Sequence, residues 1–132
     1  MLGDEAVARL AHHWEAGWNG RDLALIMEPF APDVAFSSPF VPAQSDDPTR
    51  TTVEGKEALR SYVAAALERS GDVRYSLQGA YAGVDTVVLV YTCHLSGGVD
   101  RPGADLMRLG PEGTVVEWRS HYDSDPAGWR AR

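Results

Sequence analysis

One carboxylate stands on an otherwise apolar face of a predicted strand. In the stretch GADLMRLG, residues 103–110, alternation places Asp105, Met107 and Leu109 on the same side of the strand. Burial disfavours the charged form, and no Lys or Arg shares this face over 104–110, so we expect a raised pKa for Asp105. A neutral carboxyl group donates a hydrogen bond, which suits a ligand carbonyl or enolate oxygen. Asp105 is therefore the first catalytic candidate.

A structural role for Asp105 is the alternative. Its carboxyl group would then only fix packing, through a hydrogen bond to Tyr122, Ser120 or Trp118. If Asp105 binds a ligand, its replacement by Leu should abolish the binding of phenols, which mimic an oxyanion. That replacement is also expected to leave stability equal or higher, because no buried polar group then needs a partner.

His94 is the second catalytic candidate. Imidazole titrates near neutral pH, so His94 would serve as a general base if it faced Asp105 across neighbouring strands; the alternative is an exposed residue at a strand end. His12 and His13 diverge by roughly 100° on a helix and are predicted at the surface. Cys93 is predicted to be an inert buried thiol. No phosphate loop, nucleophile elbow or metal-ligand spacing occurs, so we expect neither a cofactor nor a metal.

Helices that must position these residues fill the first half of the chain. Helical spacing of apolar residues predicts one helix from Asp4 to the Asn-Gly pair at 19–20, a short one from Asp22 to Pro29, and a third from Glu54 to the turn at 70–72. Residues 33–38 read as a strand. The proline-rich segment 39–52 has no periodicity and is predicted to be a loop that rims the pocket or closes over it as a lid.

Strands dominate the second half, where the period changes to 2. Strands are predicted at 73–81, 86–95, 104–110 and 114–122, and the short turns between them indicate an antiparallel meander in an α+β domain. The stretch TVVLVYTCHL, residues 86–95, is apolar on both faces, and three helices can cover only one of them. We therefore expect a homodimer through the convex face of the sheet.

Length and charge restrict the classes of protein. With 132 residues, we expect a single domain over 1–132. The net charge is −7 and Lys56 is the single lysine, which makes nucleic acid and anionic membranes unsuitable partners. One cysteine, no signal-peptide pattern and no membrane-length apolar run predict a soluble, cytoplasmic protein.

The order of the elements, with the strings GWNGRDLALIMEPFAPDVAFSSP, VEGKEALRSYV and GADLMRLGPEGTVVEWRSHYD, resembles the ketosteroid-isomerase and SnoaL-like group of the nuclear-transport-factor-like superfamily. The resemblance spans nearly the whole chain. It implies a cone-shaped α+β domain in which a strongly curved antiparallel sheet wraps around three N-terminal helices, with an apolar pocket open at one end and often in a dimer.

The resemblance carries the catalytic roles over only in part. By position, Asp105 falls where the steroid isomerases keep a protonated aspartic acid, Trp14 where they have an oxyanion-hole tyrosine, and Ser38 where they have the proton-shuttling aspartate. Serine and indole cannot replace a carboxylate base and a phenol donor, so a standard ketosteroid isomerase is not expected. Ser120 stands where limonene-epoxide hydrolases of the same superfamily have an aspartate, which argues against epoxide hydrolysis.

The face parity that the resemblance implies directs Asp105 and His94 into the pocket. The same parity gives a set of ligand-binding candidates: Trp14, Ser38, Val90, Thr92, Met107, Trp118, Ser120 and Tyr122.

Two functions follow from this pocket. One is a cofactor-independent isomerase, cyclase or hydrolase acting on a small apolar or cyclic compound, with Asp105 as oxyanion donor and His94, or a water held by Ser38, moving the proton. The other is a ligand-binding or accessory dimeric module without chemistry. The serine at position 38 favours the second, and the retained Asp105 favours the first.

Overall fold

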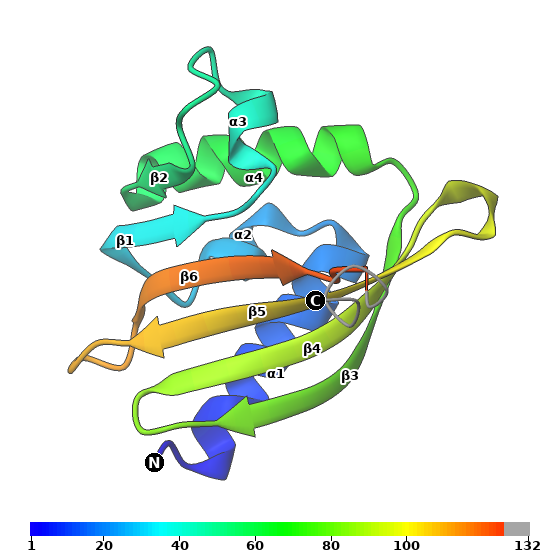
Figure 1. Ribbon diagram of the computed structural model, residues 1–132. Helices are drawn as coiled ribbons and strands as arrows, with labels where there is room; N and C mark the ends of the chain where they lie inside the picture. The colour runs from blue at the N-terminus through cyan, green and yellow to red at the C-terminus, as the bar shows by residue number, and fades with distance from the viewer. Residues whose placement is uncertain (126–132) are drawn as a thin grey trace.

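A strongly curved, six-stranded sheet wraps over helices α1 (Asp4–Gly20) and α2 (Leu23–Met27) (Figure 1). The computed structural model describes residues 1–125. The other elements are α3 (Val41–Gln44), α4 (Lys56–Ser70), β1 (Phe30–Ser37), β2 (Thr52–Glu54), β3 (Arg74–Ala82), β4 (Thr86–His94), β5 (Asp100–Leu109) and β6 (Val115–Tyr122). The strand order β2-β1-β6-β5-β4-β3 leaves the sheet unclosed, and the predicted α+β class is confirmed. Within the described residues, no helix is long and apolar enough to cross a membrane.

The core fills the concave side of the sheet. Helix α1 buries Leu10, Trp14 and Trp18, each four residues from the last, and thus presents one stripe to β3 and α2. Helix α4 does the same with Leu59, Val63 and Leu67 beside β1 and β2. Both helices therefore have the one-sided burial that the helical spacing predicts.

The pairing of the strands differs from the prediction at one place. Strands β3 to β6 form the expected antiparallel meander, but β1 joins it by parallel pairing with β6. Strand β1 also begins at Phe30 and is longer than predicted, while the expected loop 39–52 holds the short helix α3 and begins β2. Strand β5 begins at Asp100, because the chain after β4 needs only a short 3₁₀ turn at Ser96–Gly98 to reverse.

The predicted parity of β4 is wrong. Val87, Leu89, Tyr91 and Cys93 face the core, and the outward side carries the alternate residues, which include Val90, Thr92 and His94. Both faces of this strand are apolar, so alternation could not decide which one turns inward. Pairing decides it, since Leu89 lies opposite Asp105 on the concave side of β5.

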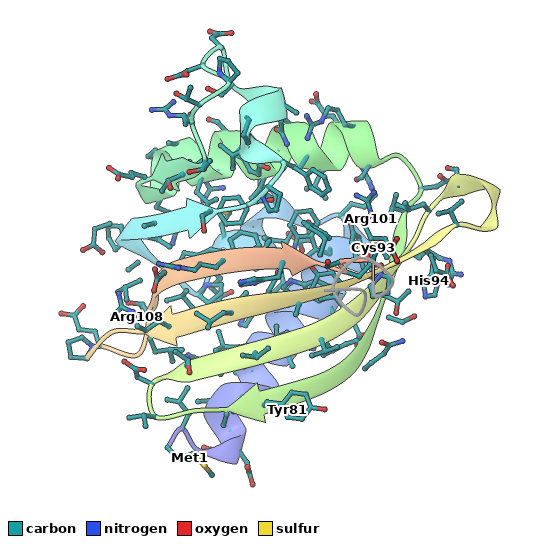
Figure 2. The ribbon with its side chains drawn as sticks, viewed as in Figure 1. Met1, Tyr81, Cys93, His94, Arg101 and Arg108 are labelled. Carbon is teal, nitrogen blue, oxygen red and sulfur yellow. The ribbon has the colours of Figure 1, made fainter. Side chains whose placement is uncertain are left out.

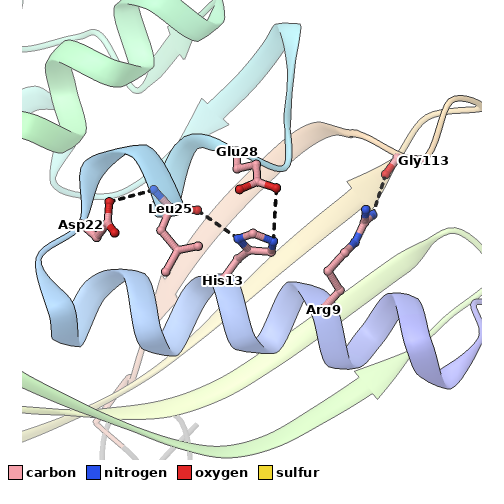
Figure 3. Close-up of polar contacts among 6 residues, drawn as sticks. All are labelled: Arg9, His13, Asp22, Leu25, Glu28 and Gly113. Carbon is pink, nitrogen blue, oxygen red and sulfur yellow. Dashed lines mark hydrogen bonds and ion pairs between the residues drawn. The ribbon is translucent and has the colours of Figure 1, made fainter.

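Polar contacts fix α1 against α2 (Figure 3). His13 Nδ1 donates to the Leu25 carbonyl oxygen at 3.2 Å, and its Nε2 lies 3.8 Å from Glu28 Oε1. The Asp22 side chain accepts from the Leu25 N–H at 3.1 Å and caps α2 as predicted. His13 is therefore held between the two helices instead of lying free at the surface.

Side chains of α1 occupy the outer edge of β3. Asn19 donates to the Tyr75 carbonyl at 2.9 Å and accepts from the Tyr75 N–H at 2.8 Å. Glu15 accepts from the Leu77 N–H at 2.8 Å. Two helical side chains thus satisfy backbone groups that an edge strand would otherwise expose.

Candidate functional site

A cavity of about 500 Å³ lies on the concave side of the sheet. Strands β1, β4, β5 and β6 line it together with α1, α4 and the start of β3. Its walls are mainly aromatic: Trp14, Trp18, Phe36, Phe40, Tyr62, Tyr75, Tyr91, Trp118 and Tyr122.

Asp105 is buried in the wall of this cavity among three donors. Trp14 Nε1 donates to Oδ2 at 3.0 Å, and Trp118 Nε1 donates to the same oxygen at 2.9 Å. The Tyr91 hydroxyl lies 2.8 Å from Oδ1. The carboxyl side chain from the centre of β5 therefore joins α1, β4 and β6 at one point.

Burial raises the pKa of Asp105 above its ordinary value, as predicted, although the hydrogen bonds from Trp118, Tyr91 and Trp14 act in the opposite direction. The indole N–H groups can only donate, so Oδ2 must remain an acceptor. The Tyr91 hydroxyl donates to Oδ1 when that oxygen carries no proton, and Ser120 also hydrogen-bonds the carboxyl group. A proton on Asp105 would sit on Oδ1, and if it pointed at the Tyr91 oxygen, the Tyr91 hydroxyl would be free to donate elsewhere.

Gly103 makes room for Tyr91. It lies opposite Tyr91 in the β4–β5 pair, and a Cβ at position 103 would come within 2.7 Å of Cε2 and 2.9 Å of the hydroxyl oxygen of Tyr91. These distances are far inside van der Waals contact. The missing side chain at Gly103 lets the Tyr91 ring lie flat against β5, where its hydroxyl reaches Asp105.

Apart from the guanidinium groups of Arg69 and Arg101, the cavity also carries thiol and phenol groups, which are neutral at physiological pH. Burial raises the pKa of the Cys93 thiol to about 11 and that of the Tyr75 hydroxyl to about 12. It also raises the pKa of Tyr91 and of Tyr122. Among the described residues, Asp105 is the one carboxyl group that lines the cavity.

Six of the predicted site residues share the cavity. Asp105, Trp14, Ser38, Trp118, Ser120 and Tyr122 all line it. Met107 faces the same side as Asp105 but is buried next to a much smaller void with Leu10 and Ile26, and so belongs to the core. Val90 and Thr92 are on the opposite side of the sheet, because the parity of β4 is the reverse of the predicted one.

His94 does not reach the cavity. Its Nε2 lies 2.8 Å from Ser76 Oγ and its Nδ1 lies 3.0 Å from Asp100 Oδ1, so both ring nitrogens have partners. Figure 2 shows His94 on the outer side of the hairpin, pointing away from the labelled Cys93 and Arg101. The hypothesis that His94 faces Asp105 across the strands is therefore wrong.

Sequence reasoning missed Tyr91 and Arg101. Tyr91 has the opposite parity from Val90, Thr92 and His94, the residues of this strand that the sequence analysis directs into the pocket. Arg101 lay outside the predicted strand 104–110, yet it belongs to β5 and shares the concave face with Asp105. The glycine opposite Tyr91 was a usable signal, since a glycine within a strand marks the close approach of another group.

No metal site is present in the part of the chain that the structure describes: it contains no group of three or more His, Cys, Asp or Glu side chains placed to hold an ion. The nearest approach to such a group is the pair His94 and Asp100, which lies on the convex face with Ser76.

The curved sheet, the helices on its concave side and the cavity between them define an α+β protein with a cone-like shape. The chain belongs to the SnoaL-like family, because the model of the SnoaL-like domain matches residues 10–128. This agrees with the resemblance noted in the sequence. No curated protein matches the chain.

Solved structures support the same fold. A SnoaL-like protein of unknown function from Burkholderia thailandensis is 25% identical with a TM-score of 0.80, over 94% of this chain and 100% of that chain. A putative isomerase of the SnoaL-like family from Agrobacterium tumefaciens is 18% identical with a TM-score of 0.71, over 91% and 99%. A protein with a ketosteroid isomerase-like fold from Catenulispora acidiphila, solved in complex with trimethylamine, is 22% identical with a TM-score of 0.67, over 86% and 85%.

Proposed function

We propose that the protein binds a small, largely apolar cyclic molecule in the cavity between its sheet and helices α1 and α4. The observation that carries the proposal is an aromatic-walled space of about 500 Å³ with one buried carboxyl group in its wall. Ligand pockets in proteins are typically about 300–1,000 Å³ and combine apolar walls with a few polar groups. The described cavity has both properties.

Trp18 supports a ligand that carries an acceptor oxygen. It lines the cavity, and its Nε1 is buried without an acceptor among residues 1–125. A buried donor of this kind is uncommon in a native structure, since an unmade hydrogen bond costs about 1–3 kcal/mol. A carbonyl or hydroxyl oxygen of a bound molecule would supply the partner.

The polar groups of the cavity are better suited to ligand binding without catalysis than to proton transfer. Ser38 stands where a base is needed, and its hydroxyl accepts a hydrogen bond from the Phe40 N–H at 3.1 Å. The thiol and phenol groups hold their protons at neutral pH, and His94 is outside the cavity. The proposed binding uses no cofactor.

Cofactor-independent acid/base catalysis is the second candidate, and the fully buried carboxyl group of Asp105, whose pKa burial raises, is the observation in its favour. With the proton on Asp105 Oδ1, Asp105 donates to Tyr91, and the Tyr91 hydroxyl can donate to a ligand oxygen that becomes negative in an isomerase, cyclase or hydrolase reaction. Asp105 then acts through Tyr91 and does not touch the ligand itself. We also propose that the chain works as one domain and as a cytoplasmic homodimer.

Quenching of tryptophan fluorescence by 2-naphthol tests the binding function, because Trp14, Trp18 and Trp118 line the cavity. We expect saturable quenching of the wild type. Ala66→Phe fills the cavity from α4 and should weaken binding at least tenfold, whereas Ala65→Phe, on the same helix but not lining the cavity, should bind like the wild type. No saturable quenching, or equal effects of the two variants, would contradict the proposal.

A further inference from the structure

Two guanidinium groups line the cavity without a carboxylate partner. Arg101 stands at the start of β5, and Arg69 in the last turn of α4. Within residues 1–125 neither forms an ion pair. On the convex face, by contrast, Arg108 Nε lies 3.2 Å and Arg119 Nη2 lies 2.7 Å from the carboxylate of Glu117. Two outward-facing arginines of the sheet thus share the carboxylate of Glu117, whereas no carboxylate of the described residues pairs with Arg101 in the cavity.

Arg101 is held in place by aromatic rings. Its guanidinium carbon lies 5.3 Å from the centre of the Phe40 ring and 5.8 Å from that of Tyr122. Its register partner is Cys93, another cavity residue, and Figure 2 shows Arg101 and Cys93 together at the end of the sheet near the last turn of α4. Ring contacts fix a guanidinium group through its flat faces and leave its N–H donors at the edge available to a ligand.

The cavity has two polar groups on β5, Arg101 and Asp105, and these lie far apart. Arg101 and Asp105 lie on the same face of β5, four residues apart, which corresponds to about 13 Å along a strand. An anion at Arg101 is thus distant from the buried carboxyl group. The protein carries a net charge of −7, so two cavity-lining guanidinium groups without an ion-pair partner among residues 1–125 are an exception on a mainly acidic molecule, and their positive charge attracts anions.

We propose that the ligand is an aromatic or alicyclic carboxylic acid, bound with its carboxylate at Arg101 and Arg69 and its rings between the aromatic walls. The proposal rests on the proposed binding function and adds the charge and orientation of the ligand. The guanidinium fork matches the two oxygens of a carboxylate, which makes such pairs short and oriented. The hydrogen-bonding groups near Asp105 remain for an uncharged oxygen at the other end of the ligand.

Two probes that differ in one charge test this assignment: 2-naphthoate and its methyl ester, each titrated by tryptophan fluorescence at pH 7.5 and low salt. The wild type should bind 2-naphthoate more tightly than the ester, and added salt should reduce the difference. Arg101→Gln should weaken 2-naphthoate roughly tenfold and leave the ester unchanged. Arg101→Lys, which keeps the charge, should retain part of the preference. Arg108→Gln, on the convex face, is the matched control and should bind both probes like the wild type.

The results separate this inference from the binding function. If both probes bind equally well to the wild type, or if Arg101→Gln weakens both to the same extent, the cavity binds ligands but does not select an acid, and the inference is wrong. If neither the probes nor 2-naphthol bind, the binding function fails as well. A selective loss of 2-naphthoate in Arg101→Gln, with thermal melting like that of the wild type, supports the inference.

Discussion

Two indole N–H groups donate to the same oxygen of Asp105, and this limits which oxygen of the carboxyl group can carry a proton. Oδ2 accepts from Trp14 and Trp118, so the acid can hold a proton only on the oxygen that faces Tyr91. The resemblance to steroid isomerases suggested an acid that donates to a ligand. In the catalytic alternative proposed above, Tyr91 would donate to the ligand and Asp105 would orient Tyr91.

Replacement of Asp105 by Leu is now expected to destabilise the protein, contrary to the expectation from sequence. It would leave the donors of Trp14, Trp118 and Tyr91 buried without an acceptor, at a net cost of about 2–4 kcal/mol. Asp105→Asn keeps an acceptor for the indoles and a donor for Tyr91, so it should stay within about 1 kcal/mol of the wild type at low pH. Urea unfolding of the three proteins measures this. A Leu variant as stable as Asn would show that the three hydrogen bonds contribute nothing.

The raised pKa of Asp105 makes part of the stability depend on pH. A group whose pKa is higher in the folded than in the unfolded state stabilises the fold fully below its unfolded pKa, and that contribution is lost as pH rises through the folded pKa. The free energy of unfolding of the wild type should therefore fall relative to that of Asp105→Asn as pH rises above about 4. Thermal melts of both proteins between pH 4 and pH 8 give the difference. A difference that grows in favour of the wild type would mean that Asp105 is ionised in the folded protein.

At the scale of elements, the packing of β4 against β5 depends on the absence of a side chain at Gly103. Gly103→Ala would place a methyl group 2.7 Å from the Tyr91 ring, so the ring must move and its hydroxyl must leave Asp105. We expect a loss of about 2–3 kcal/mol in the free energy of unfolding. A smaller residue at position 91 removes the clash, so Gly103→Ala should cost much less in a Tyr91→Leu background. Equal losses in both backgrounds would mean that the glycine is needed for another reason.

Sequence patterns predicted elements better than they predicted faces. The helices of residues 4–20 and 56–70 follow from apolar residues spaced three and four apart without the alternation of a strand. In β4 both faces are apolar, so the pattern could not decide whether Tyr91 or His94 faces the core. The two faces of the strand are the reverse of the predicted ones, and each side chain lies on the side opposite to its prediction. Asp105 stands out in the sequence because a carboxylate on an apolar face is costly to bury without partners, and Trp118, one of the partners expected for a structural role, does donate to it. Its partner Trp14 comes from α1, whose position depends on tertiary packing, and its partner Tyr91 comes from the neighbouring strand β4, whose predicted parity was the wrong one.

At the scale of the whole molecule, the outer face of the sheet predicts a homodimer. Val88 lies opposite Leu106, and Val90 opposite Ala104, all on the convex side and only half-buried in the isolated chain. Light scattering at micromolar concentration should give twice the mass of one chain. Val90→Arg should give a monomer, whereas Val84→Arg, at an exposed turn, should not. A monomeric wild type would contradict the prediction.

The same chain should not isomerise a standard unsaturated ketosteroid. The position of the base holds Ser38, and Trp14 donates to Asp105 in place of a ligand. The rise in absorbance of the conjugated product should therefore not exceed that of buffer alone. Robust turnover would show that a group other than Ser38 or His94 removes the proton.

Two side chains of α1 lie along the edge of β3 and limit how two molecules of the protein can associate. Asn19 and Glu15 occupy the N–H and carbonyl groups of Tyr75 and the N–H of Leu77, so this margin has less backbone to offer to a strand of another chain. Continuous sheets across molecules, and the fibrous aggregates that grow from them, are disfavoured at this margin. This agrees with the predicted association through the broad outer surface of the sheet, where contacts between side chains would determine the fit.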